Sequence, residues 1–219
     1  MLRLYGWEPA ALSLGWFQPR EPFEEPARRA GLEIVRRPTG GGAIHHADEL
    51  TFCLVATPGR DGYPAGIDEA YELVHELLRG ALAGLGARLA FRGGDAPRSV
   101  APRAATLCFD DTTVHDLVDE AGRKVLGSAQ RRRAGRVLHH GSLPLSVPAL
   151  TPAAGALGPC AGRPVSWEEA AAAVEEGLRA GLCDGRLVPD ELREDETERA
   201  RFLQNRRRAD ARGRATRHD

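Results

Sequence analysis

The sequence predicts an α+β fold in which mixed, largely antiparallel sheets pack with helices. Short apolar runs broken by turn residues fill the first third of the chain, and amphipathic segments follow at irregular intervals. A doubly wound sheet would need strands and helices in regular alternation, which these segments lack. The 219 residues suffice for one large domain. We therefore expect a single domain over residues 1–208 and a disordered tail over 209–219.

The strands are predicted from short apolar stretches bounded by glycine, proline or charged residues. In chain order they are 2–5, 11–15, 32–35, 50–56, 106–109, 114–118, 124–130 and 137–143. The sequence EAGR at residues 120–123 is typical of a hairpin turn. Antiparallel pairing is therefore expected in the second half of the chain.

Two helices are predicted with clear boundaries, and a third from charge. Residues 67–85 carry apolar side chains at helical spacing. Ser166 and Glu169 have the spacing of a capping box, which begins a helix that runs to about Leu182. A last, highly charged helix is expected over residues 189–208.

Three segments are predicted to be loops. Residues 18–29 contain three prolines, so we expect at most one helical turn there. Residues 92–106 have no apolar periodicity, and a loop of that length is often functional. Residues 146–163 are rich in proline, glycine and alanine and are expected to wrap the surface.

Composition excludes several classes of protein. The net charge is −1, which gives no overall field for nucleic acid or an anionic membrane. Neither a membrane-spanning apolar stretch nor a signal peptide is visible in the sequence, so we expect a cytoplasmic protein. The four cysteines lie far apart without any CxxC pair, so no metal site is expected.

Lys124 is the one lysine among 30 basic residues, and the other 29 are arginines. Such a bias indicates that arginine serves wherever a plain positive charge is enough. Lysine alone can lose its proton within reach of neutral pH. Either Lys124 survived by chance, or its chemistry is required.

Four segments contain residues suited to chemistry. Three consecutive glycines in RRPTGGGAIHH, residues 36–46, let the backbone approach a ligand and present bare N–H groups. ATLCFDD places Cys108 beside Phe109, and LHHGSLPL places His140 before Gly141. In GRKVLGSAQRRR, small residues after Lys124 leave room for a ligand. Each segment alone is weak, since a free cysteine is most often core filler and a histidine is often a hydrogen-bonded core residue.

Taken in this order, the motifs resemble the lipoate–protein ligase A and octanoyltransferase family, which shares its catalytic fold with biotin protein ligase. The resemblance covers about residues 3–145. It is carried by five motifs: LSLGWFQP, RRPTGGGAIHH, DELTF, GRKVLGSAQRRR and LHHGSLPL.

The resemblance implies an acyltransferase that moves an octanoyl or lipoyl group through a cysteine thioester onto a carrier-protein lysine. Cys108 matches the nucleophile of the cysteine-dependent branch, and Lys124 matches the active-site lysine. The substrate-binding residues implied are Arg37, Gly40, Gly41, Gly42, His46, Gly127, Ser128, Ala129, His140 and Gly141. Another branch of octanoyltransferases carries its cysteine later, so Cys160 in GPCAG is the competing nucleophile.

The resemblance also implies partners. Acyl carrier protein is expected as donor, and glycine cleavage H protein or the lipoyl domains of 2-oxoacid dehydrogenases as acceptor. No cofactor is required by a transferase. ATP and magnesium belong to an alternative, an ATP-dependent lipoate–protein ligase; a second alternative is an inactive carrier-binding module. Family members usually begin with a helix before the strand at residue 2, so that helix is expected to be absent here.

Overall fold

The computed structural model describes residues 1–95 and 106–203, except for the side chain of Cys183. Contacts divide the chain into two compact units, Met1–Arg186 and Leu187–Asp219. In the second unit, residues 194–203 are helical, so the last helix begins five residues later than predicted. The proposed tail, residues 209–219, lies outside the described residues. The single domain over 1–208 stays a prediction.

A six-stranded antiparallel sheet forms the centre of the first unit. Its strands, in spatial order, are β1 (Leu2–Tyr5), β5 (Glu49–Ala56), β9 (Arg136–Pro144), β8 (Lys124–Arg133), β7 (Leu117–Val118) and β6 (Ala90–Phe91). A smaller sheet has the order β3 (Glu33–Arg36), β2 (Ala11–Leu14) and β4 (Ile44–His46). In it, β2 is parallel to β3 and antiparallel to β4. The predicted mixed, largely antiparallel fold is confirmed.

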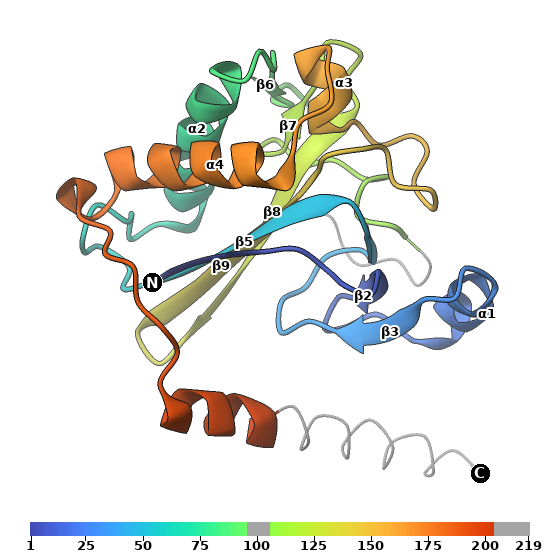
Figure 1. Ribbon diagram of the computed structural model, residues 1–219, viewed down its shortest axis with the longest axis horizontal. Helices are drawn as coiled ribbons and strands as arrows, with labels where there is room; N and C mark the ends of the chain where they lie inside the picture. The colour runs from blue at the N-terminus through green and yellow to red at the C-terminus, as the bar shows by residue number, and fades with distance from the viewer. Residues whose placement is uncertain (96–105, 204–219) are drawn as a thin grey trace. The chain divides into compact units, whose positions relative to one another are not determined.

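Two helices cover one side of the large sheet, α2 (Ile67–Ala83) and α4 (Trp167–Gly181). Figure 1 shows both on that side, while the small sheet lies on the other. Val74 and Leu78 of α2 and Leu178 of α4 are fully buried in the main core. Burial of each such side chain stabilises the fold by about 1.5–3 kcal/mol. The predicted capping box is present, because Ser166 and Glu169 each bond the other's backbone N–H.

The segment 18–29 contains a helix, α1 (Glu21–Arg29), so the loop predicted there is wrong. Pro22 lies in the first turn, where its missing N–H costs no hydrogen bond. Pro26 removes one donor, but Phe23 and Ala27 are buried against the small sheet. Burial of this apolar face offsets the lost hydrogen bond. That stabilisation depends on tertiary contacts, which the number of prolines in the segment does not indicate.

Three further boundaries differ from the prediction. The strand expected at 106–109 is reduced to one bridge, Ala43 to Leu107, followed by a turn. The strand expected at 114–118 keeps only β7. Residues 146–163 do not merely wrap the surface, because they contain α3 (Leu157–Ala161) and the fully buried Ala154 and Ala156. Alanine side chains are small enough to fill narrow spaces in the core. A segment rich in alanine, glycine and proline can therefore be buried although its composition is typical of a surface loop.

The two faces of β8 and β9 have different surroundings, and this difference positions the site. His139 bonds Ser128 and Tyr63 on the helix-covered side of the sheet. Its neighbour His140 bonds Thr39, which belongs to the segment after the small sheet's β3. Because side chains alternate along a strand, the space between the two sheets receives every second residue.

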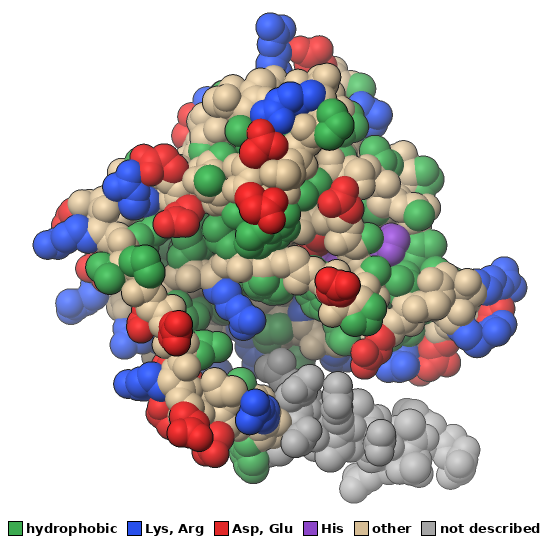
Figure 2. All heavy atoms as spheres, viewed as in Figure 1, with side chains coloured by type: hydrophobic (Ala, Val, Ile, Leu, Met, Phe, Trp, Pro, Cys, Tyr) green, Lys and Arg blue, Asp and Glu red, His purple; other side chains and the backbone are tan. Residues whose placement is uncertain are grey.

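No helix among the described residues is long and apolar enough to cross a bilayer. On the face shown in Figure 2, acidic and basic side chains of the described residues are interspersed. This mixed surface agrees with the near-zero net charge.

Candidate active site

Lys124 and Cys108 lie side by side, although they are sixteen positions apart in the sequence. Lys124 begins β8, and its Nζ lies 3.6 Å from Cys108 Sγ and 3.2 Å from the Cys108 carbonyl oxygen. The same ammonium pairs with Asp116 Oδ2 at 2.9 Å and donates to the Asp111 carbonyl at 3.3 Å. The lysine is buried, whereas the cysteine is half-buried. The structure thus brings the predicted nucleophile and the single lysine together.

Opposing effects act on the pKa of Lys124. Burial lowers it, because the charged form loses its hydration. Attraction to Cys108 and Asp116 outweighs burial, and the net result is a raised pKa. Lys124 is therefore a cation at neutral pH, suited to stabilise a thiolate or an oxyanion.

Gly127 makes room for the lysine side chain. A Cβ at position 127 would lie 2.3 Å from Lys124 Cε and 2.8 Å from Nζ. No residue with a side chain fits there while Lys124 keeps its place. The predicted role of Gly127 is therefore more specific than leaving space for a ligand.

We expect Gly127→Ala to lower the rate of acyl transfer by about tenfold to a hundredfold, because misplacing a catalytic group by about 1 Å costs that much. The fold should survive, since the crowded atoms are the free end of a flexible side chain. Steady-state rates and thermal melting of the variant measure both effects. Gly80→Ala, on α2 with open space around the added carbon, is the control and should keep full activity.

The glycine loop packs directly on the cysteine. A Cβ at Gly42 would lie 2.8 Å from the Cys108 nitrogen, and the Cys108 N–H donates to the Ala43 carbonyl at 2.7 Å. Gly41 has a φ of +92° and approaches Gly15 so closely that a Cβ on Gly15 would meet the Gly41 oxygen. Only glycine allows this approach.

Arg37 holds the glycine loop from within the protein. Its guanidinium donates to the carbonyls of Gly40 at 2.8 Å and Gly42 at 2.5 Å, and to the Ser13 carbonyl at 3.0 Å. Burial lowers the pKa of Arg37 below its ordinary value, although nearby Cys108 acts in the opposite direction. Arg37, predicted to bind substrate, thus shapes the loop that would contact substrate.

The two histidines predicted to contact substrate are both engaged by protein groups. His46 bonds Ser13 Oγ through Nε2 and Glu49 Oε1 through Nδ1, each at 2.7 Å. His140 Nε2 bonds Thr39 Oγ1 at 2.5 Å. Burial lowers the pKa of His140 to about 4, with Arg37 contributing. A histidine with that pKa is a weak proton acceptor at neutral pH.

The remaining predicted residues on β8 and β9 divide between the two faces. Ala129 pairs with His140 in the sheet, and His140 bonds Thr39 on the side of the glycine loop. Gly141 is required by the core, because a Cβ there would lie 2.4 Å from Phe52. Ser128 is not brought to the site, since its hydroxyl bonds His75 and His139 under the helices.

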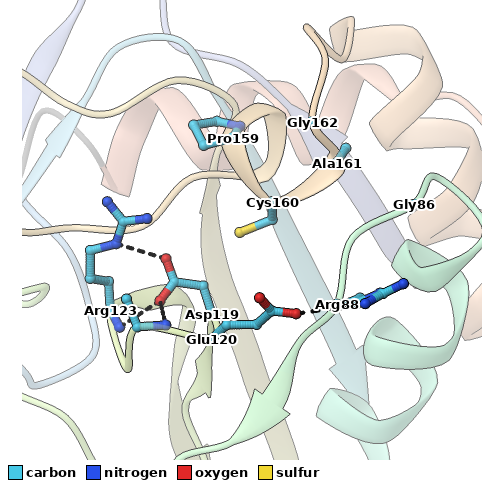
Figure 3. Close-up of a pocket in the computed structure, with 10 residues that line it drawn as sticks. Gly86, Arg88, Asp119, Glu120, Arg123, Pro159, Cys160, Ala161 and Gly162 are labelled. Atoms are coloured by element: carbon cyan, nitrogen blue, oxygen red, sulfur yellow. Dashed lines mark hydrogen bonds and ion pairs between the residues drawn. The ribbon is translucent and has the colours of Figure 1, made fainter.

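Cys160 lies in a separate pocket of about 480 Å³. Figure 3 shows its thiol directed toward Asp119 and Glu120. Arg123 pairs with Asp119 at 2.7 Å at the same pocket. Burial first, and then Asp119, raise the pKa of the Cys160 thiol, which disfavours the nucleophilic thiolate. Neither Lys124 nor the glycine loop lines this pocket.

Sequence reasoning missed Asp116 and Thr39. Asp116 holds the lysine, and Thr39 connects the glycine loop to His140. Thr39 lies in the glycine-rich motif and Asp116 in the predicted strand 114–118, but aspartate and threonine are common in turns and loops. No local spacing distinguishes a turn aspartate from the partner of a buried lysine.

Acid is expected to destabilise the protein through buried neutral histidines. Burial lowers the pKa of His75 and His140 to about 4, and that of His139 well below its ordinary value. Between pH 6.5 and 4 the unfolded chain binds these protons and the folded protein does not. Stability is therefore present above pH 6.5 and is lost as pH falls, by about 1.4 kcal/mol per pH unit for each histidine.

Urea denaturation at pH 7, 6 and 5 measures this loss. In a His140→Asn variant the free energy of unfolding should fall less steeply with decreasing pH, by the contribution of one histidine. An equal slope in the variant would show that His140 does not contribute.

Both the sequence and the fold are similar to those of known proteins. Residues 1–169 match the lipoyl protein ligase A/B catalytic domain. Octanoyltransferase LipM of Symbiobacterium thermophilum is 39% identical, over 92% of this chain and 81% of the relative. Octanoyltransferase LipM of Kyrpidia tusciae is 36% identical, over 92% and 82%. A bipartite lipoate protein ligase of Thermoplasma acidophilum has a similar fold, with a TM-score of 0.68 at 21% identity over 92% of this chain and 78% of that structure.

Proposed function

Because the chain belongs to the lipoyl protein ligase A/B catalytic domain family, we propose that it carries an octanoyl group as a thioester on Cys108 and passes it to a lysine of a lipoyl carrier. Octanoyl transfer in protein lipoylation is the activity indicated by the relatives of which this chain spans 81% and 82%. The route through Cys108 depends on one observation, the 3.6 Å between its sulfur and Lys124 Nζ.

In the first half-reaction, the Cys108 thiolate attacks the carbonyl carbon of an octanoyl thioester. The thiolate is the nucleophilic form, and the adjacent ammonium of Lys124 favours it. The carbon–sulfur bond to the donor breaks, and the donor leaves as a thiol after taking up one proton. An octanoyl thioester on Cys108 remains.

Lys124 and the glycine loop stabilise the negative oxygen of the tetrahedral intermediate. The ammonium lies between Asp116 and the cysteine and keeps its charge at neutral pH. Backbone N–H groups of the loop at Gly40–Gly42, which packs on the Cys108 backbone, would supply further donors. Loss of one such donor typically costs about a hundredfold or more in rate.

In the second half-reaction, the neutral amine of the acceptor lysine attacks the Cys108 thioester. The amide forms, the sulfur leaves, and the proton released by the amine restores the thiol. His46 and His140 are poorly suited to remove that proton, because the first has both nitrogens engaged and the second has a pKa of about 4. The departing thiolate of Cys108 is the base closest to the reaction.

The two half-reactions need a thioester donor and a lysine acceptor, and for these roles we propose the partners that the family resemblance implies. The donor is an octanoyl thioester on acyl carrier protein, and the acceptor is glycine cleavage H protein or a lipoyl domain of a 2-oxoacid dehydrogenase. A structural analysis of the lipoylation system of Thermoplasma acidophilum covers a bipartite lipoate protein ligase, which has a similar fold, and its E2 lipoyl domain. Neither half-reaction uses ATP or magnesium.

The test mixes the protein with octanoyl acyl carrier protein and a lipoyl domain without ATP. The lipoyl domain should gain the mass of one octanoyl group, and a domain whose target lysine is replaced by arginine should not. A requirement for free octanoate and ATP, with release of pyrophosphate, would instead establish the ligase alternative. Binding without transfer would establish the inactive carrier-binding module.

A further inference from the structure

Buried side chains form a continuous series of hydrogen bonds on the helix-covered side of the large sheet. Tyr63 bonds His139, His139 bonds Ser128, Ser128 bonds His75, and His75 bonds the main-chain carbonyl of His115. The four distances are 3.0, 2.8, 2.7 and 2.5 Å, in that order. Both His75 and His139 are fully buried. The transfer chemistry described above uses none of these side chains.

The carbonyl at one end fixes the direction of every bond. A carbonyl oxygen only accepts, so His75 Nδ1 carries a proton and donates it to His115. In a neutral ring the Nε2 of His75 then accepts from the Ser128 hydroxyl. Ser128 in turn accepts from His139 Nε2, and His139 Nδ1 accepts from Tyr63. Only one arrangement of protons satisfies all four bonds.

The side chains are neutral, as this arrangement requires. Burial lowers the pKa of His75 to about 4 and that of His139 well below its ordinary value. Burial also raises the pKa of Tyr63 to about 12, so its hydroxyl keeps the proton that it donates.

The series ends next to the partner of the catalytic lysine. The carbonyl of His115 and the N–H of Asp116 belong to one planar peptide unit, so fixing the carbonyl orients Asp116. Asp116 Oδ2 holds Lys124 Nζ at 2.9 Å. Two residues of helix α2 also contact the His115 ring. The ring stacks on that of Tyr71, with the ring centroids 5.3 Å apart, and its Nε2 bonds Asp68 Oδ1 at 3.0 Å.

We propose that His75 is a positioning residue, which holds the His115 carbonyl and thereby places Asp116 and Lys124 against Cys108. This inference rests on the proposed role of Lys124 beside the nucleophile. The alternative is that the series only fills the core, in which case any change at His75 would alter stability alone.

Two substitutions at His75 separate the two bonds of its ring. In His75→Asn the amide lies close to the position of Nδ1 and can still donate to the His115 carbonyl, while the bond to Ser128 is lost. In His75→Gln the amide lies close to the position of Nε2 and can still bond Ser128, while the bond to the carbonyl is lost. Both variants lose ring volume and one hydrogen bond, so they are matched in structural cost.

The first measurement is the rate of octanoyl-enzyme formation from octanoyl acyl carrier protein, followed by intact mass. We expect His75→Gln to be slower than His75→Asn by about tenfold or more, the cost of a displaced catalytic group. Equal rates in the two variants, or wild-type rates in His75→Gln, would overturn the inference.

The second measurement needs no acyl donor, so it separates this inference from the proposed function. Alkylation of Cys108 by iodoacetamide is followed by peptide mass at pH 7 and pH 10. A displaced Lys124 favours the thiolate less at pH 7. The alkylation rate at pH 7 divided by the rate at pH 10 should therefore fall in His75→Gln and stay near the wild-type value in His75→Asn. The contrast would support the inference even if wild type took up no octanoyl group, a result that would sink only the proposed function.

Two further measurements test the inference even if a His75 variant fails to fold. Nitrogen NMR of the wild-type histidines should find His75 protonated at Nδ1 and bare at Nε2; the opposite tautomer would leave the carbonyl without a donor and overturn the inference. Tyr63→Phe removes the distant end of the series. It should lower the melting temperature and leave both rates unchanged, and a loss of rate comparable to that of His75→Gln would overturn the inference as well.

Discussion

Replacing Cys108 by serine should abolish the octanoyl-enzyme and lower transfer to a lipoyl domain by roughly a thousandfold or more. A hydroxyl is a much weaker nucleophile than a thiolate at neutral pH, and loss of a nucleophile is among the largest effects of single substitutions. The neighbouring ammonium of Lys124 cannot compensate, because it favours a thiolate far more readily than an alkoxide. Intact mass after exposure to octanoyl acyl carrier protein measures the intermediate directly.

Cys160→Ser is the matched control, with the same atomic change at the other candidate nucleophile. The glycine loop does not line its pocket, so we expect a normal intermediate and a normal rate. The reverse result, an intermediate lost with Cys160 and kept in Cys108→Ser, would transfer the nucleophilic role to Cys160.

The second large effect is expected from Lys124→Arg, with a loss of about a hundredfold in rate. The variant keeps a positive charge, so Asp116 is not left as an unpaired buried charge. A guanidinium is larger and cannot take the position that Gly127 leaves open for Nζ, so one oxyanion donor is lost. Rates of octanoyl-enzyme formation measure the loss, and wild-type turnover would contradict the role of Lys124.

A second pair of variants distinguishes charge from stability. Lys124→Met leaves the buried Asp116 without its partner, which should cost about 3–5 kcal/mol in the free energy of unfolding. Adding Asp116→Asn removes the second charge and should restore much of that stability without restoring the rate. Recovery of the rate in the double variant would mean that Lys124 only balances Asp116.

Family and fold class could be predicted from the sequence, and the predicted pair Cys108 and Lys124 lies together in the structure. The family that the five motifs resemble is confirmed by the match over residues 1–169. The capping box at Ser166 and the helix that begins at Ile67 follow from local patterns, because a helix places neighbours in sequence on one face. Lys124 is distinctive in the sequence itself, because it is the one lysine among 30 basic residues.

Local patterns failed where distant residues decided the outcome. Three prolines hid α1, whose Phe23 and Ala27 are buried against the small sheet. An apolar run at residues 106–109 suggested a strand, yet a single bridge to Ala43 is followed by a turn that presents Cys108.

The sequence by itself determined which chemical groups the protein has: one lysine, a glycine loop, and cysteines able to compete as nucleophiles. Only the tertiary structure placed Lys124 beside Cys108, turned Ser128 away from the site, and supplied Asp116 as the lysine's partner. The physical reason is that motifs record residue types along a strand. Burial, pKa shifts and contact between charges arise only when strands distant in sequence enclose a common space.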